Sequence, residues 1–258
     1  MLKNKLRIYV VSLRDSTRRS LIIKQCSKLE IDFIFVDAVN GKLLSPDEIS
    51  SINNNPSVTQ RYKRKIGVGE IGCTLSHQNI YKDIIKNDID YAIIFEDDIK
   101  LSESLHEVIN YFNCVESSNL DRNLYVLGGQ EGLSSQEMLV ISGRSKIKLS
   151  ESLYFNKLNF SSRYIYRTCC YAISKTVAIN LNSVFNRSFY IADDWHYLFS
   201  QHVFDSIYFC NVANHPEDLG GSLIEKERES TGSQWQRSSV RAFLRKCKIL
   251  ARQVLRYY

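Results

Sequence analysis

The stretch YAIIFEDDIKLSE, residues 91–103, joins an apolar strand pattern to a cluster of acidic residues. Residues 91–95 are all apolar or aromatic, which is typical of a strand inside a sheet, and the carboxylates Glu96, Asp97 and Asp98 follow at once. Extended geometry places Glu96 and Asp98 on one side of the chain and Asp97 on the other. Adjacent carboxylates repel one another unless solvent, a cation or strong donors lie nearby. The pattern therefore allows two interpretations: a site for Mg²⁺ or Mn²⁺, or a polar strand end that leads into a helix.

Strand and helix patterns alternate on both sides of this stretch. The strand patterns cover residues 6–13, 32–39, 124–129, 164–174 and 205–213. The helix patterns cover residues 16–29, 44–52, 69–87, 104–115, 175–185 and 193–203, whereas 53–67 and 130–162 have the composition of polar loops. Such alternation predicts an α/β domain with a mostly parallel central sheet. Ligands of these sheets bind beyond the carboxyl ends of the strands, where Glu96–Asp98 lie.

Length and cysteine usage predict one intracellular domain. We expect a domain over residues 1–225 and a separate tail over 226–258 in this chain of 258 residues. The seven cysteines are an odd number without a C-x-x-C pair, which favours reduced thiols in a cytoplasmic protein. The N-terminus resembles a first strand more than a signal peptide, and no stretch has the roughly 18 apolar residues of a membrane span.

The net charge of +6 is concentrated in the tail. From residue 237 onward there are seven basic residues and no acidic one, leaving 27 basic and 28 acidic residues in the rest of the chain. Residues 237–257 have the pattern of a basic amphipathic helix, which predicts attachment to an anionic membrane surface, with a helix docked on the domain as the alternative. Because the body is neutral and lacks a recognition motif, we expect no nucleic-acid partner.

Two motifs together resemble a known enzyme family. GEIGCTLSH at 69–77 is followed about twenty residues later by IIFEDDI at 93–99. This pair resembles glycosyltransferase family 25, the lipooligosaccharide sugar transferases of Gram-negative bacteria and their collagen-galactosylating relatives. Weaker similarities occur at VVSLRDSTRR (10–19), FVDAVNG (35–41), CCYAIS (169–174) and GGSLI (220–224), so the resemblance spans about residues 6–225.

The resemblance implies a GT-A-like nucleotide-binding fold, a UDP-sugar donor and a divalent cation. The donor would be UDP-galactose or else UDP-glucose, the acceptor a lipooligosaccharide or another glycan, and the reaction inverting. Asp98 and Glu96 would bind Mn²⁺ or Mg²⁺, with His215 as a possible late ligand. The residues implied at the donor are Leu13, Arg14, Arg18, Asp37, Glu70, Ser76, His77, Glu96 and Asp97. Each has an ordinary alternative, because arginines on a first helix are usually solvated and a helical histidine is often structural.

An inverting transfer also requires a base that takes the proton of the acceptor hydroxyl. We expect Asp194, or else Asp193, to be this base, and an aspartate before DWHYLF is equally typical of a helix N-cap. The chain has Ile191-Ala192-Asp193-Asp194 where family members often have Pro-x-Asp, and Lys175-Thr176 where many have Gly-Ala.

The predicted protein is a metal-dependent inverting glycosyltransferase at the inner face of the cytoplasmic membrane. One alternative is another enzyme with carboxylate-bound metal, such as a nucleotidyltransferase, or a glycoside hydrolase, which needs two opposed carboxyl groups but no nucleotide. A second alternative is a non-catalytic family member that binds glycans.

Overall fold

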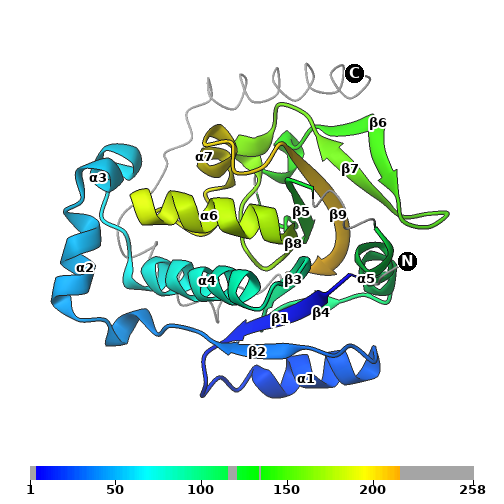
Figure 1. Cartoon of the computed structure of the whole chain (residues 1–258), viewed down its shortest axis with the longest axis horizontal. Coiled ribbons are helices and arrows are strands. Elements are labelled where there is room, and N and C mark those ends of the chain that lie inside the picture. The colour runs from blue at the N-terminus through cyan, green and yellow to red at the C-terminus, as the bar shows by residue number, and fades with distance from the viewer. Residues whose placement is uncertain (1–3, 116–120, 134, 216–258) are drawn as a thin grey trace.

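The protein folds around one sheet, which a computed structural model describes together with its helices over residues 4–115, 121–133 and 135–215. The nine strands have the order β2-β1-β3-β8-β5-β9-β7-β6, and β4 pairs with β9 outside this path (Figure 1). Their bounds are β1 Leu6–Ser12, β2 Ile34–Asp37, β3 Tyr91–Glu96, β4 Lys100–Leu101, β5 Asn123–Gly128, β6 Ile141–Lys148, β7 Tyr154–Leu158, β8 Cys170–Ser174 and β9 Ser206–Asn214.

The strand directions bring several carboxyl ends to one edge of the sheet. β1 is parallel to β2 and to β3, while β8 runs antiparallel between β3 and β5, and β5 is parallel to β9. Strands β1, β2, β3, β5 and β9 therefore all end at the same edge, and β8 begins there. The predicted α/β class is confirmed, and the sheet is mixed because β8 and the strands beyond β9 add antiparallel pairs.

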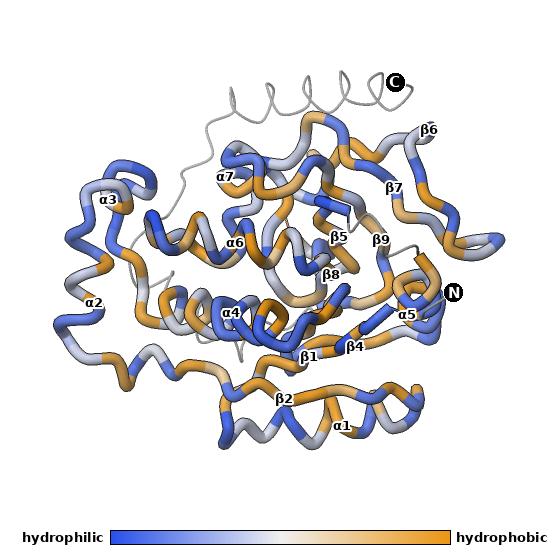
Figure 2. Tube along the Cα trace, viewed as in Figure 1, coloured by the Kyte–Doolittle hydropathy of each residue, from blue (hydrophilic) through white to orange (hydrophobic). Residues whose placement is uncertain are grey.

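Helices cover both faces of the sheet (Figure 1). Ile94 of β3 belongs to the core cluster that includes residues of α4, α6 and α7, whereas Ile93 belongs to the cluster with α1 and α5. This alternation is the period of two that a strand buried on both faces requires. The tube in Figure 2 is hydrophobic along the central strands and largely hydrophilic along α3. The helices are α1 Arg19–Lys28, α2 Pro46–Asn53, α3 Pro56–Tyr62, α4 Val68–Lys86, α5 Leu105–Cys114, α6 Lys175–Arg187 and α7 Trp195–Ser200.

Two segments that we predicted as loops contain regular structure. Residues 130–162 include the antiparallel pair β6–β7, and the loop before α4 contains α3, which begins with an Asn55 cap and Pro56 in its first turn. β6 is exposed along most of its length, so it lacks the alternation of apolar and polar residues by which strands are recognised. The helix predicted over 44–52 is confirmed as α2, and Ser45 and Glu48 form a capping box at its start.

Three further predictions concern the cysteines, a membrane span and the C-terminal tail. None of the cysteines that the structure describes, all except Cys247, is in a disulfide, as expected. No helix within the described residues is long and apolar enough to cross a membrane. The predicted tail, 226–258, and the GGSLI segment lie outside the described residues.

Candidate active site

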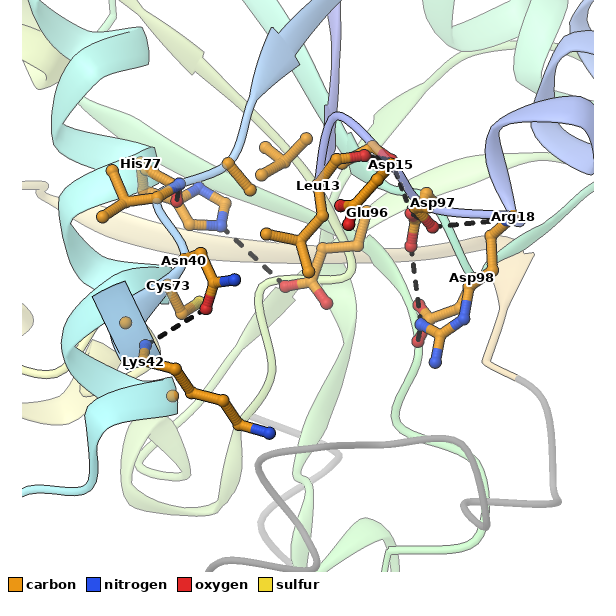
Figure 3. Close-up of a pocket in the computed structure, with 18 of the residues that line it drawn as sticks. Leu13, Asp15, Arg18, Asn40, Lys42, Cys73, His77, Glu96, Asp97 and Asp98 are labelled. Carbon is orange, nitrogen blue, oxygen red and sulfur yellow. Dashed lines mark hydrogen bonds and ion pairs between the residues drawn. The ribbon is translucent and has the colours of Figure 1, made fainter. Parts of the chain in front are cut away.

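A cavity of about 760 Å³ opens at the carboxyl ends of β1, β2 and β3 (Figure 3). Its lining comes from four segments: the loop after β1, the loop after β2, the first half of α4, and the acidic cluster after β3. An α/β sheet binds its ligands at this position, beyond the carboxyl ends of strands. Here the next two parallel strands along the chain, β2 and β3, lie on opposite sides of β1. The acidic segment that the sequence singles out therefore lines this cavity.

The loop after β2 is held against α4 by two residues of the GEIGCTLSH motif. Ser76 accepts a hydrogen bond from the backbone N–H of Val39 at 2.8 Å, and its hydroxyl donates to the carbonyl of Gly72 at 2.6 Å. A Cβ atom on Gly72 would lie 2.5 Å from the carbonyl oxygen of Val39 and 2.8 Å from the nitrogen of Gly41. The missing side chain of Gly72 therefore allows the close approach of the chain's own loop.

Glu70 lies outside the cavity lining. Its side chain is 3% exposed, and both carboxylate oxygens lie 2.7 Å from guanidinium nitrogens of Arg64. The same carboxylate accepts the N–H of Gly67, which caps the start of α4. These contacts give Glu70 a structural task that does not need the donor contact implied by the family resemblance.

Asp97 organises the loop after β1. The hydroxyl groups of Ser12 and Ser16 donate hydrogen bonds to its Oδ2 atom at 2.6 and 2.7 Å. A carboxylate oxygen with two such donors is satisfied by the protein itself. The strand geometry had set Asp97 apart from Glu96 and Asp98, and its contacts agree with that separation.

Asp98 is a partly buried carboxylate with incomplete partners. Its Oδ2 atom lies 2.9 Å from the Arg18 guanidinium and 3.9 Å from Nε2 of His215, whereas Oδ1 is buried and has no hydrogen-bond partner. Burial raises the pKa of Asp98 above its ordinary value, and the negative charge of Glu96 raises it further. An unpaired buried carboxylate oxygen is costly unless a cation binds it.

Glu96 lies between two groups of side chains at the centre of the site. Thr168 donates a short hydrogen bond to its Oε1 atom, and Nε2 of His77 lies 3.8 Å from the same oxygen. Burial alone would raise the pKa of Glu96, but His77 and Thr168 together hold that pKa below its usual value. Glu96 is thus stabilised as a carboxylate, beside an Asp98 that is not.

The residues present fit an oxygen-preferring divalent cation. Glu96 and Asp98 supply carboxylates, and Nε2 of His215 lies 3.9 Å from Oδ2 of Asp98. Mg²⁺ and Mn²⁺ favour such ligands and complete their coordination with substrate phosphates. The unpaired Oδ1 atom of Asp98 is the observation on which this fit rests.

Of the residues predicted at the donor near β1 and β2, some line the cavity and others do not. Leu13 and Arg18 line the cavity, whereas Arg14 is exposed and does not. Asp37 is also outside the lining, and its carboxylate binds Arg19. Arg19 additionally donates to the carbonyl of Leu13 at 3.0 Å, so this pair fixes the loop after β1.

The two candidate bases differ in how they are held. Asp194 caps α7, because Oδ1 accepts the N–H of Tyr197 at 3.2 Å and Oδ2 accepts the hydroxyl of Tyr62 at 2.9 Å. Asp193 accepts the N–H of Arg167 at 3.1 Å, and the next residue, Thr168, binds Glu96. Neither aspartate lines the cavity, but Asp193 is linked to Glu96 through the adjacent residues Arg167 and Thr168, which favours it over Asp194.

Our sequence reasoning missed two side chains of the site. Cys73 lines the cavity one helical turn before His77, and the four-residue spacing on a predicted helix was a usable signal. Thr168 reaches Glu96 across 72 positions of sequence, and no local pattern indicates this contact.

Comparison with known proteins identifies the family of this chain. The chain matches glycosyltransferase family 25 (LPS biosynthesis protein) over residues 5–196. Procollagen galactosyltransferase 2 of Homo sapiens is 26% identical over 173 residues, which cover 65% of this chain and 26% of that protein. A provisionally named glycosyltransferase of Haemophilus influenzae is 31% identical over 137 residues, covering 45% of this chain and 48% of that protein.

A further relative, the inactive glycosyltransferase 25 family member 3 of Homo sapiens, is 27% identical over 158 residues, covering 57% of this chain and 27% of that protein. This chain therefore spans about a quarter of the length of the human relatives. A solved glycosyltransferase involved in glycosylation of the major capsid of PBCV-1 aligns at a TM-score of 0.39 and 8% identity, covering 87% of this chain and 97% of that one. The family match includes the cavity residues from Leu13 to Asp98 and the aspartates before α7, and the chain belongs to glycosyltransferase family 25.

Proposed function

We propose that this family member is a metal-dependent transferase that moves a hexose from a UDP-sugar to a glycan acceptor, with inversion at the anomeric carbon. The observation that carries the proposal is the presence of Glu96 and Asp98 together in the cavity lining. Glu96 is held as a carboxylate, and Asp98 keeps a buried oxygen without a partner. A cation bridging to a diphosphate would satisfy both.

The donor site is assigned to the loops after β1 and β2. Asp98, Glu96 and His215 would hold the cation, and Arg18 and Lys42 add positive charge to the lining. When bound, the cation supplies charge neutralisation for the departing nucleotide diphosphate. Ser76 and Gly72 act indirectly: the hydroxyl of Ser76 holds the loop that carries Lys42, and the missing side chain of Gly72 leaves room for that loop.

Asp193 is proposed as the base. The acceptor hydroxyl oxygen forms a bond to the anomeric carbon while the bond from that carbon to the diphosphate oxygen breaks, and the hydroxyl proton passes to the carboxylate. Two adjacent residues orient the two carboxylates: the N–H of Arg167 donates to Asp193, and the hydroxyl of Thr168 donates to Glu96. Because one segment contacts both the base and the cation ligand, it would keep the distance between them constant.

Galactose, a lipooligosaccharide acceptor and attachment to the inner face of the cytoplasmic membrane are further parts of the proposal. They are supported by the description of the family as LPS biosynthesis proteins, by the galactosyltransferase relatives and by the basic residues from 237 onward. Galactose is preferred to glucose on the names of the relatives alone. The alternative is a non-catalytic family member, which the inactive human relative favours and the paired Glu96 and Asp98 oppose.

The test is a screen of UDP-sugars for transfer to purified lipooligosaccharide, and for slow hydrolysis without acceptor, each with Mn²⁺, with Mg²⁺ and with chelator. Asp98→Asn is the key variant, and Asp205→Asn is the matched control because it lies before β9 at the opposite edge of the sheet, with its side chain 63% exposed. We expect activity that requires the cation, that Asp98→Asn abolishes and that the control retains. Activity that survives Asp98→Asn would refute the cation assignment, and full activity in chelator would refute metal dependence.

A further inference from the structure

A second group of metal-binding side chains lies on the other side of Glu96. Cys73, His77 and Glu96 each offer one ligand atom, and these atoms all lie within 4.8 Å of one another. Cys73 and His77 are four residues apart on α4, so they face the same way, and both line the cavity into which Glu96 projects (Figure 3). Asp98 and His215 are not members of this group.

His77 is prepared as a ligand by its neighbours. Its side chain is 1% exposed, and Nε2 makes no hydrogen bond, because the 3.8 Å separation from Glu96 is too long for one. The other ring nitrogen, Nδ1, lies 2.7 Å from the hydroxyl of Tyr171, which in turn lies 2.8 Å from the hydroxyl of Tyr81. With a cation bound, Tyr171 would donate to Tyr81 and its oxygen would accept the Nδ1 proton, which frees the lone pair of Nε2 for the cation. Such support of the second ring nitrogen is usual for metal-binding histidines.

We propose that a thiophilic divalent cation, Zn²⁺ in the first instance, binds Sγ of Cys73, Nε2 of His77 and a carboxylate oxygen of Glu96. Sulfur, imidazole and carboxylate ligands select Zn²⁺ over Mg²⁺ or Mn²⁺. Three protein ligands leave a fourth position open toward the cavity. Tetrahedral zinc separates such ligand atoms by about 3.3–3.6 Å, so the side chains close by roughly 1 Å. The thiol proton is released to solvent on binding.

Sharing of Glu96 gives this site a consequence for the transferase. A zinc ion that takes Glu96 removes it from the cation held with Asp98, so Zn²⁺ opposes Mn²⁺ or Mg²⁺. This consequence rests on the proposed function. Binding of zinc does not, because it requires neither nucleotide nor acceptor.

The test is a titration of the metal-free full-length protein with Co²⁺, a spectroscopic substitute for Zn²⁺, in the absence of any sugar donor. We expect a thiolate-to-cobalt charge-transfer band that Zn²⁺ displaces. Cys73→Ser should abolish the band, and both Cys73→Ser and His77→Gln should weaken Zn²⁺ binding by at least about tenfold. Cys114→Ser is the matched control, because Cys114 is an exposed cysteine at the end of α5.

The outcomes separate this proposal from the proposed function. Absence of the band in the wild-type protein, its persistence in Cys73→Ser, or its loss in Cys114→Ser would each overturn the zinc site. Asp98→Asn should keep the band, because Asp98 is not a member of the group, whereas its effect on sugar transfer tests only the transferase. A thermal melt of each variant identifies loss of fold, and Cys73→Ser replaces only a sulfur by an oxygen.

Discussion

Replacement of Gly72 by alanine is expected to move the loop that forms one wall of the cavity. The added Cβ would lie 2.5 Å from the oxygen of Val39 and 2.8 Å from the nitrogen of Gly41. Both are backbone atoms, so neither can rotate away, and the loop must shift to restore ordinary contact. That shift also strains the 2.8 Å hydrogen bond between Ser76 and the N–H of Val39.

The expected magnitude is the difference between two opposing effects. Overpacking of this kind typically costs about 1–3 kcal/mol, and contact with fixed backbone atoms favours the upper part of that range. Alanine in a helix recovers up to about 1 kcal/mol relative to glycine. We therefore expect Gly72→Ala to lower the free energy of unfolding by about 1–2 kcal/mol. The displaced loop should also weaken UDP binding, because Lys42 lies on it.

Urea unfolding followed by circular dichroism measures the first effect, and calorimetric titration with UDP measures the second. The control is Asn79→Ala, an exposed position on the same helix, which changes helix propensity without adding a buried atom. It should leave stability unchanged or raise it by about half a kcal/mol. A Gly72→Ala variant as stable as the wild type, with equal affinity for UDP, would show that the contact between Gly72 and the loop contributes to neither stability nor donor binding.

Three further predictions concern the carboxylates. Thr168→Val removes the hydroxyl that donates to Glu96, so we expect Mn²⁺ affinity, measured by calorimetry, to fall about 10–100-fold, and unchanged affinity would contradict this. The pKa of Asp98 is raised above 3.8, so the folded state binds this proton more tightly than the unfolded state does. Asp98 should therefore make the metal-free protein less stable as pH rises from 3.8 to the raised pKa. Mn²⁺ affinity should fall as pH drops through that raised pKa. Asp98→Asn should raise the melting temperature of the metal-free protein at neutral pH. A lower melting temperature would show that the ion pair with Arg18 stabilises the protein more than burial of the Asp98 charge destabilises it. Asp194→Ala should cost about 1–2 kcal/mol of stability through loss of the α7 cap, whereas Asp193→Asn should abolish transfer with little change in the melting temperature, and the reverse result would exchange their roles.

The features predicted from sequence are those with a local physical cause. The apolar run before Glu96 identifies β3, and the period of two along it separates Asp97 from its neighbours. Ser45 and Pro46 identify the start of α2 by the chemistry of a helix N-terminus. The location of the site follows from these elements, because ligands bind at the carboxyl ends of strands.

The features that were missed depend on pairing between distant segments. Thr168 contacts Glu96 only because β8 enters the sheet beside β3 in the antiparallel direction, with Cys170 opposite Phe95. Glu70 belongs to the motif that indicates the family, yet it is directed to Arg64 and away from the cavity. A sequence motif therefore mixes residues that contact ligand with residues that shape the helix carrying them, and only the tertiary contacts separate the two.

The position of Glu96 explains how one short acidic segment can serve two cations of different chemistry. On one side it faces Asp98, whose buried oxygen requires a hard, oxygen-preferring ion. On the other side it faces His77 and Cys73, which suit a softer ion. Both proposed sets share the carboxylate, so occupation of one would oppose occupation of the other, and the ratio of free Zn²⁺ to free Mn²⁺ would then control the proposed transfer. A Cys73→Ser variant that lost sensitivity to Zn²⁺ while it retained its dependence on Mn²⁺ would separate the two sets experimentally, whereas inhibition by Zn²⁺ that persisted in this variant would have to act elsewhere.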